Sequence, residues 1–533
     1  MAYLLSYDIG TTGVKTCLFS VDEDLRLIAH RTQGYPLYIL PDGGAEQDGD
    51  DWWCGMCETT RALFADVDVR PEQVEGISFC SQMQATILTD AEGVPVHRPM
   101  IYMDQRATEE IKKGIAYGPQ IAGANIFKAI PSLIITGAIT SSVKDPVWKY
   151  KWIEAHEPEA FSRAAHWLDV KDYLISRCTG KFIMTEDSAF STLIYDTRPG
   201  KTGWSKTMCR MFDIREDLLP PIIRSTDRVG GLTEKAAAEL GLAAGTPVFG
   251  GGGDSSLVGV GAGCVRTGDT HMYIGTSGWV ITVTDHQMVD ADTMIAAIVG
   301  AQSGKYNYFA EMETAGKCLE WAKNHLAQDE IGIYAEKTGV DEAFPEQYPS
   351  LYDALTEAAG NADPGSGGVI FTPWLHGNRC PFEDPNSMGM YFGVKLNTGK
   401  DELIRATLEG TFYHLRWMLE CQDRKLKTAE VIRLVGGGAL SPVSCQMLAD
   451  ITGRTIEVTR DPQNAGSVGA AAVAAVGLGL IPDLEQIRDF IPVVGTYVPD
   501  KERHAAYEPY YRVFKKLHSA NRKLFAELNR AGA

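Results

Sequence analysis

Hydrophobic residues in this chain gather in short runs that alternate with glycine-containing turns, a pattern typical of buried strands. The runs at 2–8 and 14–21 enclose the turn Ile-Gly-Thr-Thr-Gly. About half a chain later, the runs at 270–275 and 279–284 enclose the near copy Ile-Gly-Thr-Ser-Gly. One strand–turn–strand unit in each half predicts two domains of the same architecture that face each other. Two unrelated hairpin turns remain the alternative, because the matched segment is short.

Two later hydrophobic strands end in glycine clusters that lead into helices. In residues 246–263 an apolar strand runs into four glycines, then Asp254 and a predicted helix. The glycines let another molecule approach the backbone beside this carboxylate, which favours function over the plainer alternative of a helix cap. In residues 431–453 the strand ends in three glycines, with Ser441 as predicted N-cap and Pro442 as first helical residue. This second arrangement suits a nucleotide, with phosphate or ribose at the helix start.

Two helical stretches invite other interpretations. Apolar residues at helical spacing begin near residue 52 and include Cys54-Gly-Met-Cys57, which resembles the active-site tetrapeptide of thioredoxins. Aspartates suited to a helix start precede it, instead of the strand that a redox Cys-X-X-Cys motif follows. We therefore predict a structural helix, whereas the redox alternative requires both cysteines to be exposed. The Ala- and Gly-rich stretch 465–482 is predicted to be a tightly packed internal helix and not a membrane span.

The length of 533 residues exceeds what one hydrophobic core usually serves, which supports two large domains. The formal net charge of −19, without any lysine- or arginine-rich run, argues against nucleic acid or an anionic membrane as partner. A phosphorylated small molecule stays open, because backbone amides, a metal and local dipoles can hold it. The start of the chain lacks a basic leader, and 11 scattered cysteines indicate the reducing cytoplasm.

Of the two repeated turns, the first has an acidic residue beside it, Asp8, and the second has none. Both turns offer glycines and paired hydroxyls, which bind phosphate oxygens without a lysine. These hydroxyls belong to Thr11 and Thr12 in the first turn and to Thr276 and Ser277 in the second. If both turns grip one polyphosphate, the carboxylate of Asp8 would hold its Mg²⁺ ion through water.

Together these motifs resemble those of the FGGY carbohydrate kinases, within the actin and hexokinase type of ATPase fold. The stretch 389–410 matches the family's C-terminal signature, and 145–158 approximates the N-terminal signature with Ala155 at a usually polar position. Further family-like blocks are AEQDGDDWW, VKDYLISRCTG and NRCPFEDP. The resemblance runs from about residue 3 to 480 and, among subfamilies, is greatest to xylulokinases.

The resemblance implies an α/β fold of two ribonuclease-H-like domains with a central cleft. The N-terminal sugar-binding domain would span 1–245, the C-terminal nucleotide-binding domain 246–483, and a helical tail 484–533. ATP and Mg²⁺ are implied as cofactors, and a small sugar or polyol as substrate, with a ketopentose such as xylulose favoured. Asp254 would act as the general base on the attacking sugar hydroxyl, and Asp8 would order the metal and its waters.

The remaining site residues also follow from the resemblance. Nucleotide contacts are assigned to Thr11, Thr12, Lys15, Gly275, Thr276, Ser277, Gly437, Gly438 and Ala439. The sugar side is assigned to Gln82, Met83, Gln84, Asp104, Arg106 and Ser255. Gln84 replaces a sugar-contacting histidine of xylulokinases, and Ser255 replaces a Gln or Asn that usually follows the catalytic Asp. Both departures fall on positions that touch the acceptor sugar, so the sequence leaves the substrate open among ketoses and polyols.

Three further alternatives stay open at this point. Arg106 could instead form a surface ion pair with Glu109 or Glu110. The amphipathic tail could pack on its own domain or on a partner, which leaves a homodimer open. A non-enzymatic ATPase module of the actin or chaperone kind would share the turns but need no sugar wall.

Overall fold

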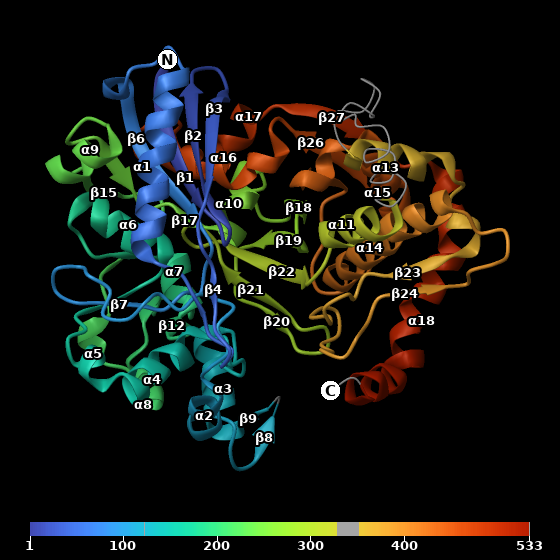
Figure 1. The fold of residues 1–533 in the computed structure, drawn as a ribbon, viewed down its shortest axis with the longest axis horizontal. Helices are drawn as coiled ribbons and strands as arrows, with labels where there is room; N and C mark the ends of the chain where they lie inside the picture. Colours follow the sequence, from blue (N-terminus) through green and yellow to red (C-terminus); the bar gives the residue numbers. More distant parts are fainter. Residues whose placement is uncertain (122, 328–350, 532–533) are drawn as a thin grey trace, which may run out of the picture.

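Two mixed β-sheets, one in each half of the chain, organise the fold (Figure 1). The structure is a computed structural model that describes residues 1–121, 123–327 and 351–531. The first sheet has the order β15-β16-β6-β1-β2-β3, with β17 also paired to β6. Its strands are β1 (Ala2–Ile9), β2 (Gly13–Val21), β3 (Leu25–Gly34), β6 (Val74–Ser81), β15 (Arg228–Gly231), β16 (Pro247–Phe249) and β17 (Gly252–Gly253).

The second sheet has the order β20-β21-β22-β19-β18-β25-β26-β27. Its strands are β18 (Thr270–Ile274), β19 (Gly278–Thr284), β20 (Val289–Asp290), β21 (Ile295–Val299), β22 (Tyr306–Met312), β25 (Val431–Val435), β26 (Thr455–Thr459) and β27 (Val493–Tyr497). Its central part repeats the first sheet, because β22-β19-β18 are antiparallel like β3-β2-β1, and β18-β25-β26 are parallel like β1-β6-β16. The predicted pair of like-built domains is confirmed.

Two helices rich in small residues pack between the two sheets, α10 (Asp254–Gly261) and α16 (Ala465–Gly477). Their backbones touch, since a Cβ added at Gly261 would lie 1.8 Å from the carbonyl oxygen of Ala465, and one at Gly469 would lie 2.1 Å from that of Leu257. Only glycine permits this approach. The predicted internal helix is therefore confirmed, and no helix within the described ranges is long and apolar enough to cross a membrane.

The Cys-X-X-Cys sequence lies in helix α1 (Gly49–Asp66), whose N-cap Asp48 accepts a hydrogen bond from the backbone N–H of Asp50. Cys54 is exposed, but Cys57 is buried in the hydrophobic core of the first domain, and this burial raises the pKa of its thiol to about 11. A redox pair needs two reachable sulfurs and at least one readily formed thiolate. The structural interpretation is confirmed and the redox alternative is wrong.

The C-terminal segment packs on its own half of the molecule. Strand β27 joins the second sheet, and helix α18 (Lys501–Ala531) buries Tyr507, Tyr511 and Phe514 in the core of the second domain. Of the two placements left open by the sequence, the structure shows the intramolecular one. The domain bounds stay a prediction, although β16 and β17 extend the first sheet beyond residue 245.

Candidate active site

Two carboxylates lie at one edge of the first sheet. Asp8 on β1 is in register with Cys80 on β6, and Cys80 is in register with Gly252 on β17, which Asp254 follows two residues later. These strands are parallel, so their carboxyl ends meet at the same edge. The start of α16 closes the edge, because a Cβ at Gly466 would lie 3.5 Å from Oδ2 of Asp8.

The electrostatics of this edge disfavour negative charge on both acids. Burial raises the pKa of Asp254 to about 7, against the hydrogen bond from the Ser255 N–H, and the charges of Asp8 and Glu311 raise it further. Burial also raises the pKa of Asp8, while the ammonium of Lys15 lowers it. A carboxyl group that titrates near neutral pH is suited to accept and release a proton.

Backbone contacts fix the position of Asp254. It is the first residue of α10, and the N-cap is Gly253, so the carboxylate does not occupy the cap position itself. The N–H of Gly253 donates to Oδ2 of the buried Asp187 at 2.8 Å. Oδ1 of Asp254 accepts the N–H of Ser255 at 2.7 Å, which leaves Oδ2 without a hydrogen bond inside the described chain.

The segment Gln82–Met83–Gln84 lies against these same residues. The Oγ of Ser255 donates to Sδ of Met83 at 3.3 Å, and a Cβ at Gly253 would lie 2.0 Å from that sulfur. Gln82 is buried and donates from Nε2 to Oε1 of Gln47 at 2.7 Å. The structure thus brings the predicted sugar-side loop next to the predicted base.

Asp104 and Arg106 form a buried ion pair. Nη2 of Arg106 lies 2.8 Å from Oδ2 of Asp104 and 2.6 Å from Oε1 of Glu46, and its guanidinium lies 4.3 Å from the ring centroid of Trp152. Asp104 also accepts the N–H of Ala45. The alternative of a surface ion pair for Arg106 is wrong.

The turns predicted to bind phosphate lie at the ends of matching strands. The β1–β2 turn exposes Thr12, and the β18–β19 turn exposes Thr276. Thr11 is partly buried, and its hydroxyl lies 3.4 Å from Oε1 of Gln82, so the first turn also borders the sugar-side loop. Lys15 points to the other half of the chain and donates from Nζ to Oδ1 of Asn464 at 2.9 Å.

The third glycine cluster follows β25 and packs beside the second turn. A Cβ at Gly436 or at Gly438 would lie 2.5 Å from atoms of Ile274, so these two glycines are required by packing. Gly437 is exposed and faces open space.

The next helix, α15 (Pro442–Thr452), begins as predicted, since the Ser441 hydroxyl accepts the N–H of Ser444. Of the other nucleotide-side residues, Gly275 and Ser277 lie in the β18–β19 turn and Ala439 is buried.

The chemistry of Asp8 fits a magnesium ion held mainly by other groups. Within the described residues no cluster of three or more His, Cys, Asp or Glu side chains could enclose a metal. Mg²⁺ prefers one or two carboxylates together with substrate phosphates and water over an all-protein cage. A partly exposed carboxylate beside a hydroxyl-bearing turn meets that requirement.

Sequence reasoning missed four charged residues that bear on this site: Lys149, Asp169, Asp187 and Glu311. Two of them could have been found from sequence motifs. Lys149 lies within the stretch that approximates the N-terminal signature, and Asp169 directly precedes the family-like block at 170–180. No local pattern marks the other two, which reach the site through the fold.

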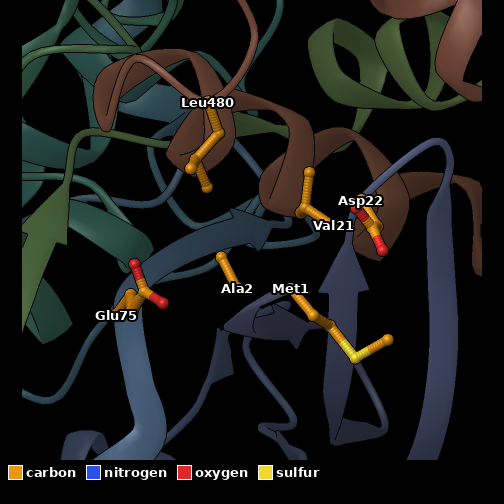
Figure 2. A pocket seen from close by; sticks show the side chains of 6 residues that line it. All are labelled: Met1, Ala2, Val21, Asp22, Glu75 and Leu480. Carbon is orange, nitrogen blue, oxygen red and sulfur yellow. The ribbon is translucent and has the colours of Figure 1, made fainter.

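A surface pocket elsewhere on the molecule is not part of this site (Figure 2). It is lined by Met1, Ala2, Val21, Asp22, Glu75 and Leu480. Ala2 and Glu75 lie at the amino ends of β1 and β6, and Val21 lies at the carboxyl end of β2, whereas Asp8 lies at the carboxyl end of β1. Six residues of extended strand separate the two by about 20 Å.

The two repeated sheets, together with the family models that match them, define the class of protein, a two-domain kinase with the actin- and hexokinase-like ATPase fold. Models for the N-terminal and the C-terminal domain of the FGGY family of carbohydrate kinases match residues 3–261 and 271–478. The chain belongs to the FGGY family of carbohydrate kinases, and it is an ATP-dependent kinase of a small-molecule sugar. The comparisons contain nothing that favours the non-enzymatic alternative.

Relatives and solved structures cover the chain almost from end to end. It is 29% identical over 516 residues to a xylulose kinase of Escherichia coli, covering 96% of this chain and 98% of that one. It is 26% identical over 525 residues to a gluconokinase of Bacillus subtilis, covering 97% and 95%. The ligand-bound xylulose kinase of Lactobacillus acidophilus has the same fold, with a TM-score of 0.84 at 23% identity over 99% of this chain and 100% of that one.

Proposed function

We propose that this kinase transfers the γ-phosphate of ATP to a hydroxyl of a ketopentose, with xylulose the favoured acceptor, and that Asp254 is the general base. The observation that carries the proposal is the placement of Asp254 beside the Gln82–Gln84 loop, through the contacts of Met83 with Gly253 and Ser255. The similarity to a xylulose kinase along the whole chain supports the choice of acceptor.

The protonation behaviour of Asp254 suits this role. Its pKa of about 7 means that a substantial fraction is ionised at neutral pH, while the protonated form that follows the transfer is not costly. Phosphoryl transfer passes through a loose transition state, for which positioning and charge neutralisation matter more than a strong base. A carboxylate fixed at a helix start, with one oxygen lacking a partner, can align a sugar hydroxyl with the phosphate.

Asp8 would hold Mg²⁺, which supplies charge neutralisation to the phosphates when bound. Thr11, Thr12, Lys15, Thr276 and Ser277 would contact the phosphate oxygens. The two exposed hydroxyls, those of Thr12 and Thr276, lie on the equivalent turns of the two domains, which suits a polyphosphate held between them.

The adenosine would lie over the third glycine cluster, at Gly437, Gly438 and Ala439, with Gly275 in the adjoining turn. Support comes from Gly437, whose Cα faces open space beside the start of α15. An exposed backbone without a side chain lets a flat base approach closely.

A gluconate kinase is the second candidate, because the gluconokinase of Bacillus subtilis is also similar along the chain. The charges on the sugar side favour a neutral acceptor. Asp104 and Glu46 already engage Arg106 in the buried ion pair, and Asp169 adds a further buried carboxylate. Because Arg106 is already paired with these carboxylates, an anionic sugar acid would meet negative charge there.

The experiment is a coupled assay of ADP release with ketoses, aldoses, polyols and gluconate, for the wild type and for Asp254→Asn. We expect a ketopentose to give the largest kcat/KM. The variant should lose kcat by about 100- to 10,000-fold, because an amide cannot take the proton, while its affinity for ATP by calorimetry changes little. Release of ADP that only gluconate stimulates would exclude the ketopentose. A folded variant that keeps more than about a tenth of the wild-type kcat would remove Asp254 as the base.

We also propose a cytoplasmic location, because all 11 cysteines are free and 10 of them are buried. The absence of nucleic-acid partners stays a prediction of the sequence, and a homodimer stays open.

A further inference from the structure

The backbone of Gln84 has an unusual conformation, with φ at +63°. For a residue with a side chain, this left-handed region is strained and persists only where the surroundings hold it. Gln84 lies in the loop that touches the residues around Asp254. The contacts that hold this peptide therefore bear on the sugar side of the site.

Two buried side chains of opposite charge form hydrogen bonds with the peptide units on either side of Gln84. Its N–H donates to Oδ2 of Asp169 at 2.9 Å, and the N–H of Ala85 donates to Oδ1 at 3.0 Å. Its carbonyl oxygen accepts a hydrogen bond from Nζ of Lys149 at 2.5 Å. Asp169 is 2% exposed and Lys149 is 0% exposed. The N–H and the carbonyl group of this strained residue are thus both bound by buried charged groups. Hydrogen bonds to charged groups are stronger than those between neutral groups.

Lys149 also connects two separate segments of the sugar side. Its Nζ donates to the carbonyl oxygen of Ile101 at 3.1 Å, and Ile101 lies three residues before Asp104. Burial lowers the pKa of Lys149 to about 8, against the opposing charges of Asp104 and Asp169. Holding a charged ammonium in the interior is costly, and a pair of well-packed apolar residues is often as stable. The ammonium of Lys149 joins the peptide of Gln84 to the segment that precedes Asp104.

We propose that Lys149 and Asp169 are positioning residues that set the shape of the Gln82–Gln84 loop and thereby the choice of acceptor sugar. Lys149 binds the carbonyl oxygen of Gln84, and Asp169 binds the N–H groups of Gln84 and Ala85. This inference rests on the proposed function and on the assignment of Gln84 to the sugar side.

The first test compares Lys149→Met with Lys151→Met, which removes a lysine from the same helix, α4 (Pro146–His156). Lys151 pairs with Glu154 and Asp213 near the surface. We expect Lys149→Met to raise the KM for D-xylulose about tenfold or more and to change the kcat/KM ratio of D-xylulose to D-ribulose. The KM for ATP should stay within about twofold. The control should change none of these values.

The second test is Asp169→Asn, which keeps one acceptor oxygen and should give a smaller change of the same kind. It also keeps the proposal testable if Lys149→Met fails to fold. A double variant of Lys149→Met with Gln84→Ala should have nearly the same sugar KM as Gln84→Ala alone, because residues that act through one another are not additive.

The outcomes separate this inference from the proposed function. If Gln84→Ala changes sugar KM and selectivity while Lys149→Met and Asp169→Asn, both folded, do not, the positioning role is overturned and the acceptor loop stands. If the two variants lower thermal stability and raise the ATP and sugar KM together, their role is structural and the inference is again overturned. If Gln84→Ala itself changes neither sugar KM nor selectivity, the assignment of the acceptor loop fails.

Discussion

The backbone N–H of Gly253 donates to Oδ2 of Asp187 at 2.8 Å, across 66 residues of sequence. Asp187 lies on α7 (Glu186–Ser191) and is fully buried, and Gly253 directly precedes Asp254. The helix that begins with Asp254 is thus tied to the body of the first domain at its first turn. Misplacement of a reacting group by about 1 Å can cost on the order of 100-fold in rate.

Asp187→Ala should therefore lower kcat by about ten- to a hundredfold. The N–H of Gly253 would lose its acceptor, and Asp254 would no longer be held in one position. Asp187→Asn keeps an acceptor oxygen and should retain most of the activity. Steady-state kinetics at saturating sugar and ATP provide the measurement. Equal kcat for Asp187→Ala and the wild type would show that the hydrogen bond does not position the base.

The rate should depend on pH through Asp254. Since the pKa of this residue is about 7 and the base must be ionised, kcat/KM for the sugar should rise from about pH 5 to about pH 8 with a midpoint near 7. Asp254→Asn should have a flat profile over this range at its lower rate. A wild-type profile that is already level at about pH 5 would contradict the raised pKa.

The ionisation of Asp254 should lower the stability of the folded protein as the pH rises, although it raises the rate. Its pKa is raised from 3.8 to about 7 on folding, so its stabilising contribution is complete below about pH 4 and is lost as the pH rises through 7. Above that pH the folded wild type holds a charge in a poorly solvated site. Asp254→Asn should consequently raise Tm more at pH 8 than at pH 5. A variant that is equally stabilised, or destabilised, at both values would show that burial does not penalise the charge.

Asp8→Asn should raise the Mg²⁺ concentration that gives half-maximal rate, because an amide is a poorer ligand for a hard cation than a carboxylate. Asp22→Asn is the matched control, since Asp22 is exposed at the other end of the same β1–β2 hairpin. A magnesium titration of the rate at saturating substrates is the measurement. Unchanged magnesium dependence and rate in Asp8→Asn would return this residue to the role of a turn residue.

Adjacent glycines of the third cluster should respond differently to the same substitution. Gly437→Ala adds a methyl group to open space and should raise the KM for ATP severalfold with little change in Tm. Gly438→Ala places the methyl 2.5 Å from the side chain of Ile274 and should destabilise the protein by about 1–3 kcal/mol. Thermal melts and ATP kinetics separate the two effects. A Gly437→Ala variant with wild-type KM for ATP would place the nucleotide elsewhere.

The C-terminal helix should depend on one buried ion pair. Nε of Arg405 lies 2.6 Å from Oε1 of Glu409, and Nη2 donates to the hydroxyl of Tyr507 on α18 at 2.6 Å. Arg405→Met leaves the carboxylate of Glu409 without its cation and should cost about 3–5 kcal/mol. Arg512→Met, on the exposed face of α18, should cost little. Urea unfolding compares them, and equal stability of the two variants would contradict the anchoring role.

Much of the architecture could be predicted from local sequence, because it depends on periodicity and on terminal residues. The repeated strand–turn–strand units, the helix starts at Asp48 and Ser441, and the buried helix in 465–482 each follow from residues within a few positions of one another. The family resemblance and the kinase activity follow from motifs of the same local kind. Each of these features is specified by residues that lie close to it in the sequence.

The partners of charged residues could not be predicted in this way. For Arg106 the sequence left open an ion pair with Glu109 or Glu110, whereas the fold supplies Asp104 and, from 60 residues away, Glu46.

The sequence by itself determined that this is a two-domain FGGY kinase, and it predicts Asp8 and Asp254 as the carboxylates of the active site. Only the tertiary structure decided that Asp254 is buried, which raises its pKa to about 7, and that Lys149 and Asp169 form hydrogen bonds on both sides of Gln84. The physical reason is that burial and charge pairing arise from contacts between distant segments, and hydrophobic periodicity specifies which face of a strand or helix is buried but not which side chain it will meet.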